Sequence, residues 1–334
     1  MLEQKITPLL VKPTFMAASW SDPIRVQLAA VESRLREVPE GQHPVLTGAI
    51  EGLFGAGGKR VRPALSLLTA GIFGVDEDQA VSIAAAVEML HTATLVHDDL
   101  IDGAMLRRGA PTLNSIWSSD VSVLVGDYLF SRAASLIARV KVVDIMDLFA
   151  DTLSVILNGE ITQKFSKWQI DRQEYDRRIY AKTAALFVLS AQSAAILGGA
   201  DTASLSAVID FGHNLGMAFQ IVDDVLDYVG KANKLGKPIG GDLRQGLFTL
   251  PAILYDEAHP NDRDIQYLLE ERDGNPEVVE SLIRKIQNSE AIEAAMQEAD
   301  VFLEKGQYAL ELIPPSIYKD SLFMLAEVLV NREM

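Results

Sequence analysis

The sequence predicts an all-α protein, and three observations support this fold class. The chain is 49% hydrophobic but only 7% aromatic, which suits packed helices better than a β-sandwich. Apolar residues recur at three- and four-residue spacing along most of the chain, and alternation with a period of two residues is never sustained. Its 334 residues allow a large buried core. We expect a single domain over residues 1–334, with an N-terminal extension at 1–20.

The first predicted helices lie in the N-terminal third. Residues 24–37 carry apolar side chains on one face, and a loop containing Pro and Gly follows them. Residues 55–63 form a Gly-rich, basic turn, after which Pro63 is well placed to open the next helix. A long helix rich in Ala, Val and Leu is then expected from Asp78, as its N-cap, to Asp102.

The rest of the chain continues the helical pattern. Further helices are expected at about 119–138, 141–165, 173–199, 203–229 and 247–257. From Asp262 onward the chain is acidic and amphipathic, with breaks at Gly274–Pro276 and Pro314–Pro315.

Charge and composition exclude several classes of function. A formal net charge of −16 disfavours binding to nucleic acid, because such a surface repels phosphate backbones. The absence of Cys excludes disulfides, thiolate metal sites and thiol nucleophiles. The N-terminal stretch lacks the apolar core of a signal peptide, and no uncharged apolar run of about 18 residues predicts a transmembrane segment. We therefore expect a soluble, cytoplasmic protein.

Two acidic motifs carry the strongest chemical signal. In the first, Asp98 and Asp102 are four residues apart, with Asp99 beside Asp98, so two carboxylates project from one helix face. Like charges at this spacing repel, and a divalent cation with oxygen ligands resolves the conflict. A single such motif is also typical of an acidic helix end in water.

The pattern recurs at Asp223, Asp224 and Asp227, again within an apolar helix. Two such helices facing each other would form an acidic cleft that holds several magnesium ions together with substrate phosphates. The recurrence makes the metal interpretation much more specific than one motif alone.

Basic residues cluster near these motifs. The turn at 57–63 offers exposed backbone amides, including that of Gly58, together with Lys59, Arg60 and Arg62 next to a helix start, a combination that suits an anion. Arg107 and Arg108 follow the first acidic motif directly. A solvated turn is the alternative interpretation of each cluster.

Other polar residues align with the motifs along the predicted helices. His91 precedes Asp98 by two turns, and Gln220 precedes Asp224 by one turn, so each shares a face with an acidic motif. The pair Lys182 and Thr183 completes this set. The Gly-rich segment between Gly230 and Gly246, which contains Lys237, is equally compatible with a lid over diphosphate and with an exposed loop.

Taken together and in this order, the motifs resemble those of the trans-type polyprenyl diphosphate synthases, a family of the isoprenoid synthase group. The resemblance extends from about residue 57 to 251 and continues plausibly to the C-terminus. It is carried by GGKRVRP (57–63), EMLHTATLVHDDLID (88–102), LRRGAPT (106–112), GDYLF (126–130), GEITQ (159–163), YAKTAALF (180–187), FQIVDDVLDY (219–228) and GKPIGGDL (236–243).

The resemblance implies an antiparallel helical bundle around a deep central cavity, usually in a homodimer. It implies about three Mg2+ ions per active site once diphosphate is bound. The metal ligands it implies are Asp98, Asp99, Asp102, Asp223 and Asp227, with Asp224 in support. The residues it implies for isopentenyl diphosphate are Gly58, Lys59, Arg62, His91 and Arg108. For the allylic diphosphate and its reacting carbons they are Arg107, Lys182, Lys237, Thr183 and Gln220.

By the same resemblance, the protein condenses isopentenyl diphosphate with an allylic diphosphate primer by metal-assisted ionisation. Ala93 and Thr94 occupy positions where bulky residues stop chain growth early, and both are small. One helical turn of about 5.4 Å matches roughly one isoprene unit, so we expect a product of about C30 or longer. Met89 and Leu90, one turn earlier, remain candidates for the floor of the tunnel. Transient membrane contact for product release is also expected.

One position departs from the family, and alternative functions remain. Leu247 stands where many members have Lys, which leaves more of the diphosphate contact to Lys237. The alternatives are a shorter-chain farnesyl or geranylgeranyl diphosphate synthase, a class I terpene cyclase and a non-catalytic partner subunit. The second DDxxD motif and the basic turn argue against a cyclase, and two intact acidic motifs argue against a non-catalytic subunit.

Overall fold

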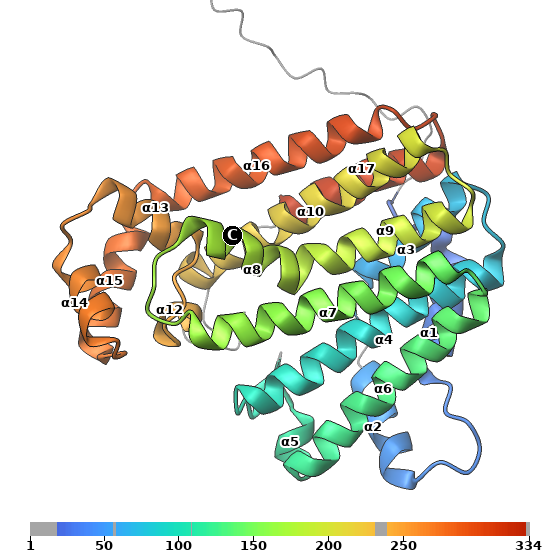
Figure 1. Cartoon of the computed structure of the whole chain (residues 1–334), viewed down its shortest axis with the longest axis horizontal. Helices are drawn as coiled ribbons and strands as arrows, with labels where there is room; N and C mark the ends of the chain where they lie inside the picture. Colours follow the sequence, from blue (N-terminus) through green and yellow to red (C-terminus); the bar gives the residue numbers. More distant parts are fainter. Residues whose placement is uncertain (1–18, 56–57, 108, 231–238, 332–334) are drawn as a thin grey trace, which may run out of the picture.

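The computed structural model describes residues 19–331 apart from 56–57, 108 and 231–238. These residues are almost entirely helical, as predicted (Figure 1). The helices are η1 (Asp22–Ile24), α1 (Arg25–Arg36), α2 (Pro44–Gly55), α3 (Val61–Ile72), α4 (Glu77–Ile101), α5 (Leu113–Ile116), α6 (Ser119–Val140), α7 (Val143–Phe165), α8 (Arg172–Ile179), η2 (Tyr180–Ala184), α9 (Ala185–Leu197), α10 (Thr202–Val229), α12 (Gly241–Arg244), α13 (Leu250–Ala258), α14 (Arg263–Glu271), α15 (Pro276–Gln287), α16 (Ala291–Leu310) and α17 (Ile317–Val330).

Among the described residues, the only strands form one short antiparallel hairpin. Strand β1 (Leu106–Arg107) pairs with β2 (Ala110–Pro111) just after α4. Gly109 lies between the strands with φ +80°, a left-handed conformation that glycine adopts without steric cost. The basic turn predicted after the first acidic motif is therefore a tight hairpin.

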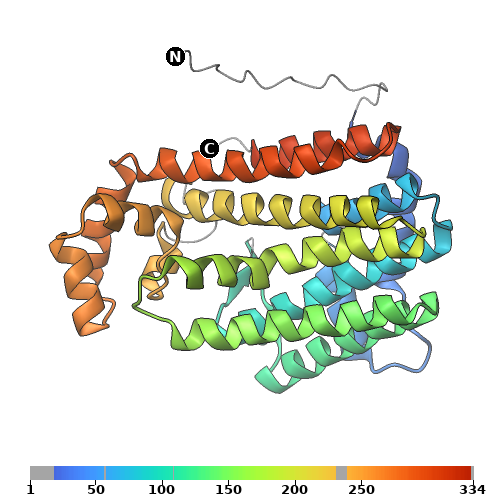
Figure 2. The ribbon, with the colours of Figure 1, turned by 45° about the horizontal axis from the view of Figure 1, so that its top comes forward.

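The core of the bundle is formed by α3, α4, α9 and α10. Helix α4 packs against α1, α3 and α6, and α10 packs against α9 and α16. Helices α3 and α9 are apolar on nearly every side and almost completely buried, as expected for helices surrounded by other helices. Figures 1 and 2 show the long helices running side by side, with α14 and α15 at one end of the molecule.

Two predicted helix starts are wrong by two residues. The N-cap of α4 is Asp76, which accepts hydrogen bonds from the backbone N–H groups of Asp78 and Gln79, so Asp78 lies in the first turn. Helix α3 begins at Val61, and Pro63 is its third residue. In both cases the terminus is set by the residue whose backbone leaves the helix.

Helix α2 is absent from the prediction, which treated its surroundings as loop and turn. Its sequence, PVLTGAIEGLFG, contains several Gly residues, which are weak helix formers. Burial of Ala49, Ile50 and Phe54 against the rest of the core stabilises the helix despite these local preferences. The predicted breaks before α15 and α17 are confirmed.

Three helical segments of the described chain are long and apolar enough to cross a membrane, where the sequence predicts none. They are Glu77–Ile101, Ser119–Val140 and Arg172–Leu197. In the first and third, 78% of the apolar window is buried inside the protein, so their hydrophobicity serves the core. In Ser119–Val140 only 39% is buried, which leaves an apolar face on α6.

Candidate active site

The first acidic motif lies at the C-terminal end of α4. Asp98 is in the last turn and half-buried, and Asp102 is the exposed C-cap, whose N–H donates to the Asp98 carbonyl at 2.8 Å. Asp102 also accepts a hydrogen bond from the Lys164 ammonium of α7 at 3.0 Å. The two carboxylates therefore flank one turn of helix, as the spacing predicts.

Asp99 points to a different partner. It is 8% exposed, and the Nε–H of Arg107 donates to both of its carboxylate oxygens, at 2.9 and 2.8 Å. Arg107 is held there by the β1–β2 hairpin. In this structure a predicted metal ligand and a predicted diphosphate contact thus bind each other.

The charge around Asp98 is unfavourable for its ionised form. Burial raises the pKa of Asp98 to about 6, with further increase from the nearby negative charges of Glu160 and Asp102, while Lys182 and Arg107 oppose the shift. A cation that binds to such a carboxyl group, next to a second carboxylate, stabilises its ionised form.

The second acidic motif lies near the C-terminal end of α10. Asp223 and Asp227 are half-buried and share one helix face, whereas Asp224 is 3% exposed. The Tyr175 hydroxyl of α8 and the Gln220 amide each donate to Asp224 at 2.8 Å. Burial raises the pKa of Asp224 to about 7, with a further contribution from the charge of Asp242.

The hydrogen bonds continue from Gln220 to Thr183, whose hydroxyl donates to the Gln220 side-chain oxygen. A chain of contacts therefore runs from Thr183 through Gln220 and Asp224 to Tyr175. It fixes the amide orientation of Gln220, because the NH2 group faces the Asp224 carboxylate and the oxygen faces Thr183. Asp224 thus holds Gln220, one of the predicted site residues, in a fixed orientation.

Lys182 and Thr183 lie in a π-helical turn, η2, within the continuous helix Arg172–Leu197. Single π-turns of this kind occur frequently at functional sites. Neighbouring helices approach η2 closely through glycine: a Cβ at Gly159 would lie 2.5 Å from the Ala181 Cβ, and one at Gly216 would lie 2.5 Å from the Ala184 Cα. No sequence pattern predicted this turn, although the two glycines were a usable signal.

Lys182 is surrounded by acidic residues, two of which belong to the first motif. Burial alone would lower the pKa of Lys182, but Glu160, Asp242, Asp98 and Asp102 raise it above its ordinary value. Water nevertheless reaches the side chain, which is exposed.

Asp242 belongs to the side of the second motif. The backbone N–H groups of Gly241 and Asp242, at the start of α12, donate to the Asp227 carboxylate at 3.1 and 3.2 Å. Lys182 is thus influenced by Asp98 of the first motif and by Asp242, which is hydrogen-bonded to Asp227 of the second motif. Figure 1 also shows α4 and α10 ending toward the side of the molecule where α12 lies.

The predicted isopentenyl diphosphate residues lie on α4 and at the start of α3. Gly58 and Lys59 are exposed, His91 is half-buried, and Arg62 is 9% exposed with its guanidinium 5.1 Å from the centre of the Phe187 ring. His91 lies about 10 Å from Asp98 along the helix axis, given seven residues of rise. Arg108 and Lys237 lie outside the described residues.

The predicted chain-length residues lie on the N-terminal side of Asp98. Met89, Leu90 and Ala93 are at most 1% exposed, and Thr94 is half-buried. Leu247, at the position where the family often has Lys, is 5% exposed and forms an isolated parallel bridge with Gln169. Its side chain serves packing.

The donor set suits a hard divalent cation. Among the described residues, no three His, Asp or Glu side chains lie close enough to form a ready-made metal cage. Carboxylates on two helices, supplemented by substrate phosphates and water, are the arrangement that Mg2+ commonly uses. The acidic residues around Lys182 fit such a cation.

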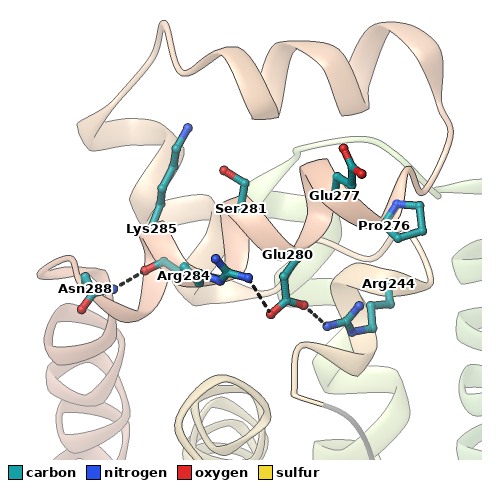
Figure 3. A pocket seen from close by; sticks show the side chains of 8 residues that line it. All are labelled: Arg244, Pro276, Glu277, Glu280, Ser281, Arg284, Lys285 and Asn288. Carbon is teal, nitrogen blue, oxygen red and sulfur yellow. Dashed lines mark hydrogen bonds and ion pairs between the residues drawn. The ribbon is translucent and has the colours of Figure 1, made fainter.

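A surface pocket on α15 lies apart from these residues (Figure 3). None of the predicted site residues lines it, and its lining consists of Arg244, Pro276, Glu277, Glu280, Ser281, Arg284, Lys285 and Asn288. Its cations are already paired: Arg244 and Arg284 contact Glu280 at 2.5 and 3.8 Å, and Lys285 contacts Asp262 at 2.7 Å.

Known proteins of one family match most of the chain. The polyprenyl synthetase family matches residues 43–286. The chain is 38% identical to the octaprenyl diphosphate synthase of Haemophilus influenzae over 280 residues, which cover 83% of this chain and 85% of that protein.

Solved structures are similar over nearly the whole chain. Heptaprenyl diphosphate synthase from Staphylococcus aureus has a TM-score of 0.88 at 33% identity, with 93% of this chain and 99% of that chain covered. A polyprenyl synthase from Caulobacter crescentus, complexed with calcium and isoprenyl diphosphate, has a TM-score of 0.85 at 34% identity, with 94% and 97% covered. The chain therefore belongs to the polyprenyl synthetase family and is a long-chain trans-prenyltransferase.

Proposed function

We propose that this protein condenses isopentenyl diphosphate with an allylic diphosphate at the site around Lys182. The observation that carries the proposal is the position of Lys182, which lies next to Thr183 in η2 and is influenced by Asp98 and Asp102 of the first motif. It is also influenced by Asp242, whose backbone N–H donates to Asp227 of the second motif. A raised pKa keeps its ammonium group charged, so it can bind an anionic diphosphate beside cations held by the carboxylates.

Asp98, Asp99, Asp102, Asp223 and Asp227 would hold magnesium, with about three ions once diphosphate is bound. When bound, Mg2+ supplies positive charge to the departing diphosphate. Asp99 contacts Arg107 in the structure. Substrate binding would exchange this pair, so that Arg107 turns to the diphosphate and Asp99 to the metal.

The reaction needs stabilisation of two opposite charges. The allylic carbon–oxygen bond breaks and its electron pair leaves with the diphosphate, where Lys182, Arg107 and Lys237 bind the developing negative charge. The oxygens of Thr183 and Gln220 face the allylic cation, and their orientation is fixed through Asp224. The isopentenyl double bond then attacks this carbon and leaves a tertiary cation on the isopentenyl unit. Loss of an adjacent proton to the released diphosphate gives the new double bond of the elongated diphosphate.

The second substrate would bind at the basic turn. Gly58, Lys59, Arg62 and His91, together with Arg108, supply the positive charge and hydrogen-bond donors that isopentenyl diphosphate requires. A class I cyclase would have no use for this second anion site.

A purified-chain assay with isopentenyl diphosphate, several allylic primers and Mg2+ tests the proposal, with chromatography of the dephosphorylated products. We expect Mg2+-dependent formation of products of about C30 or longer, judged from one turn of helix per isoprene unit. Formation of a cyclic hydrocarbon without isopentenyl diphosphate would indicate a cyclase, and no product with any primer would indicate a non-catalytic subunit.

The Thr94→Phe variant tests product length on α4. Thr94 is half-buried one turn before Asp98, so an aromatic ring there should block the growing chain. We expect the main product to shorten while consumption of the first isopentenyl diphosphate continues. An unchanged product length would show that the chain does not grow past this face of α4.

We propose that the exposed apolar face of α6 and α7 forms a homodimer interface. Leu124 is 65% exposed and Phe165 is 80% exposed, and further apolar side chains are exposed on the same two helices: Val123, Val155, Leu157 and Ile161. A patch of this kind on a soluble protein marks an interaction site. Sedimentation of the wild-type chain and of Leu124→Glu should give dimer and monomer, respectively.

The remaining expectations belong to the same proposal. Residues 1–334 form one functional unit, which acts in the cytoplasm and contacts a membrane transiently when the lipid product leaves. Cell fractionation with and without substrate supply tests the location, and activity after removal of residues 1–18 tests whether the N-terminal extension is needed.

A further inference from the structure

Arg60, which the proposed function does not use, has an unusual conformation. It is the N-cap of α3 with φ 47° and ψ 42°, in the left-handed region that L-residues other than Gly, Asn and Asp rarely adopt. Its side chain is only 10% exposed. A large, charged residue in a disfavoured backbone conformation indicates that its side-chain contacts determine the shape of this turn.

Those contacts come from three helices. The Nε and Nη2 atoms of Arg60 donate to the two carboxylate oxygens of Glu32 on α1, at 2.5 and 3.1 Å, and Nη1 donates to Glu88 on α4 at 2.9 Å. The guanidinium also lies 5.8 Å from the centre of the Phe54 ring on α2. Carboxylates contact both edges of the guanidinium, so its N–H groups bind protein partners and are not directed to a substrate.

The same guanidinium lies against the proposed isopentenyl diphosphate turn. A Cβ at Gly58 would lie 3.0 Å from Arg60 Nη1, so the guanidinium fills the space next to this glycine. Lys59 and Arg62 are its neighbours in sequence, and Glu88 precedes His91 by three residues on α4. Arg60 therefore joins the basic turn to the helix that carries the other proposed diphosphate residue.

We propose that Arg60 is a positioning residue for isopentenyl diphosphate. Through Glu32 and Glu88 it fixes the turn that presents Gly58, Lys59 and Arg62 at a set distance from His91, and it does not contact the substrate itself. This inference rests on the proposed function, specifically on binding of isopentenyl diphosphate at this turn. Loss of the Arg60 side chain should therefore weaken binding of this substrate and leave ionisation at the site around Lys182 unaffected.

A purely structural ion pair is the alternative, and α1 and α4 offer a matched control. Arg34 of α1 donates to Asp78 at 2.8 Å and to Ser82 at 3.1 Å, both on α4. Like Arg60, it links these two helices through a guanidinium, but it lies at the start of α4 and away from the basic turn. Arg34→Met removes a link between the same two helices without changing the turn, although its partner Asp78 is 76% exposed.

The experiment compares steady-state kinetics and thermal unfolding of Arg60→Met, Arg60→Lys and Arg34→Met. For Arg60→Met we expect KM for isopentenyl diphosphate to rise about tenfold, while KM for the allylic primer and kcat change less than about twofold. Arg60→Lys should recover only part of this loss, since an ammonium group cannot contact two carboxylates with fixed fork geometry. Arg34→Met should change the melting temperature only.

A triple variant keeps the inference testable if Arg60→Met does not fold. Replacing Arg60 by Met together with Glu32→Gln and Glu88→Gln leaves no unpaired buried carboxylate, so stability should largely return. The raised KM for isopentenyl diphosphate should persist, because the Arg60 guanidinium is still missing. If stability and KM both return to wild-type values, Arg60 has only a structural role.

Two further variants separate this inference from the function on which it rests. Lys59→Ala and Arg62→Ala should raise KM for isopentenyl diphosphate if the turn binds that substrate. If they do and Arg60→Met does not, the positioning role is wrong and the binding turn stands. If none of the three variants changes this KM, the substrate binds elsewhere, and both the proposed pocket and the role of Arg60 are wrong.

Discussion

The two acidic motifs have the same residue pattern but different surroundings. In both, the second Asp is buried, Asp99 on α4 and Asp224 on α10, while the first and fifth positions are more accessible. Asp99 is held by a cation, the guanidinium of Arg107. Asp224 is held by two neutral groups, the Tyr175 hydroxyl and the Gln220 amide.

The difference separates a mobile motif from a fixed one. Arg107, on the β1–β2 hairpin, can be exchanged for substrate if a metal ion binds Asp99 at the same time, because the buried carboxylate then keeps a positive charge beside it. The hydrogen bonds to Asp224 are buried between α8 and α10, where an unsatisfied partner is costly. We therefore infer that the first motif rearranges when diphosphate binds and that the second provides a rigid floor.

The largest expected effect on turnover comes from removing the first Asp of either motif, which is a proposed metal ligand in both. Asp98→Ala and Asp223→Ala should each reduce kcat/KM by about 10³-fold or more, because several kcal/mol of leaving-group stabilisation depend on the bound cations. Asp210→Ala removes an exposed carboxylate from the same helix as Asp223 and should leave turnover unchanged. Near-wild-type rates in either motif variant would contradict the two-motif metal site.

A smaller effect is expected at the fixed floor. In Asp224→Asn, the side-chain amide can no longer accept hydrogen bonds from both Tyr175 and Gln220, so Gln220 loses its orientation. We expect kcat to fall about 10- to 100-fold, as for other residues that orient catalytic groups. Tyr175→Phe removes one of the two hydrogen bonds and should cost less than about tenfold.

Steady-state kinetics with saturating Mg2+ measure both variants. A decrease in kcat would support the role of Asp224 in orienting Gln220. A change in the Mg2+ requirement alone would instead make Asp224 a metal ligand.

The pH dependence of metal binding should distinguish the first motif. The pKa of Asp98 is raised to about 6, first by burial and then by the charge of Glu160. Because Mg2+ binds the ionised carboxylate, the half-saturating Mg2+ concentration should rise up to about tenfold per pH unit below this pKa. The raised pKa also means that, through this group, metal-free protein is most stable below pH 4 or so and loses stability as pH rises through about 6.

Glu160→Gln provides the control for this titration. Removal of the like charge lowers the pKa of Asp98, so the loss of Mg2+ affinity should begin at a lower pH than in wild type. Calorimetric titration of Mg2+ into both proteins with inorganic diphosphate measures this, and comparison of the two cancels the titration of diphosphate itself. Identical pH profiles would contradict the role of Asp98.

The sequence was most informative where the relevant contact lies within one helix. The spacing of Gln220 and Asp224 predicted that they share a face, and a hydrogen bond joins them. Helical periodicity likewise predicted α6, α7 and α10 within a few residues, because packing follows the apolar stripe.

Contacts between distant segments were beyond the same reasoning. Tyr175 reaches Asp224 across 49 residues, and Arg60 meets both Glu32 and Glu88 across 28 residues. Each of these side chains would be an ordinary helix or turn residue by local pattern. The π-turn at Lys182 was missed for a related reason, since it depends on close packing by Gly159 and Gly216 from two other helices.

The smallest expected effect concerns the exposed edge of the first motif, where Lys164 contacts Asp102 at 3.0 Å. Both side chains are more than one-third exposed, so the pair should contribute less than about 1 kcal/mol to the free energy of unfolding. Lys164→Met should therefore leave denaturant unfolding almost unchanged. It should also lower the Mg2+ requirement slightly, because Asp102 no longer has a competing cation beside it. A large loss of stability would mean that the first motif is as rigidly anchored as the second, and the contrast between a mobile motif and a fixed floor would then fail.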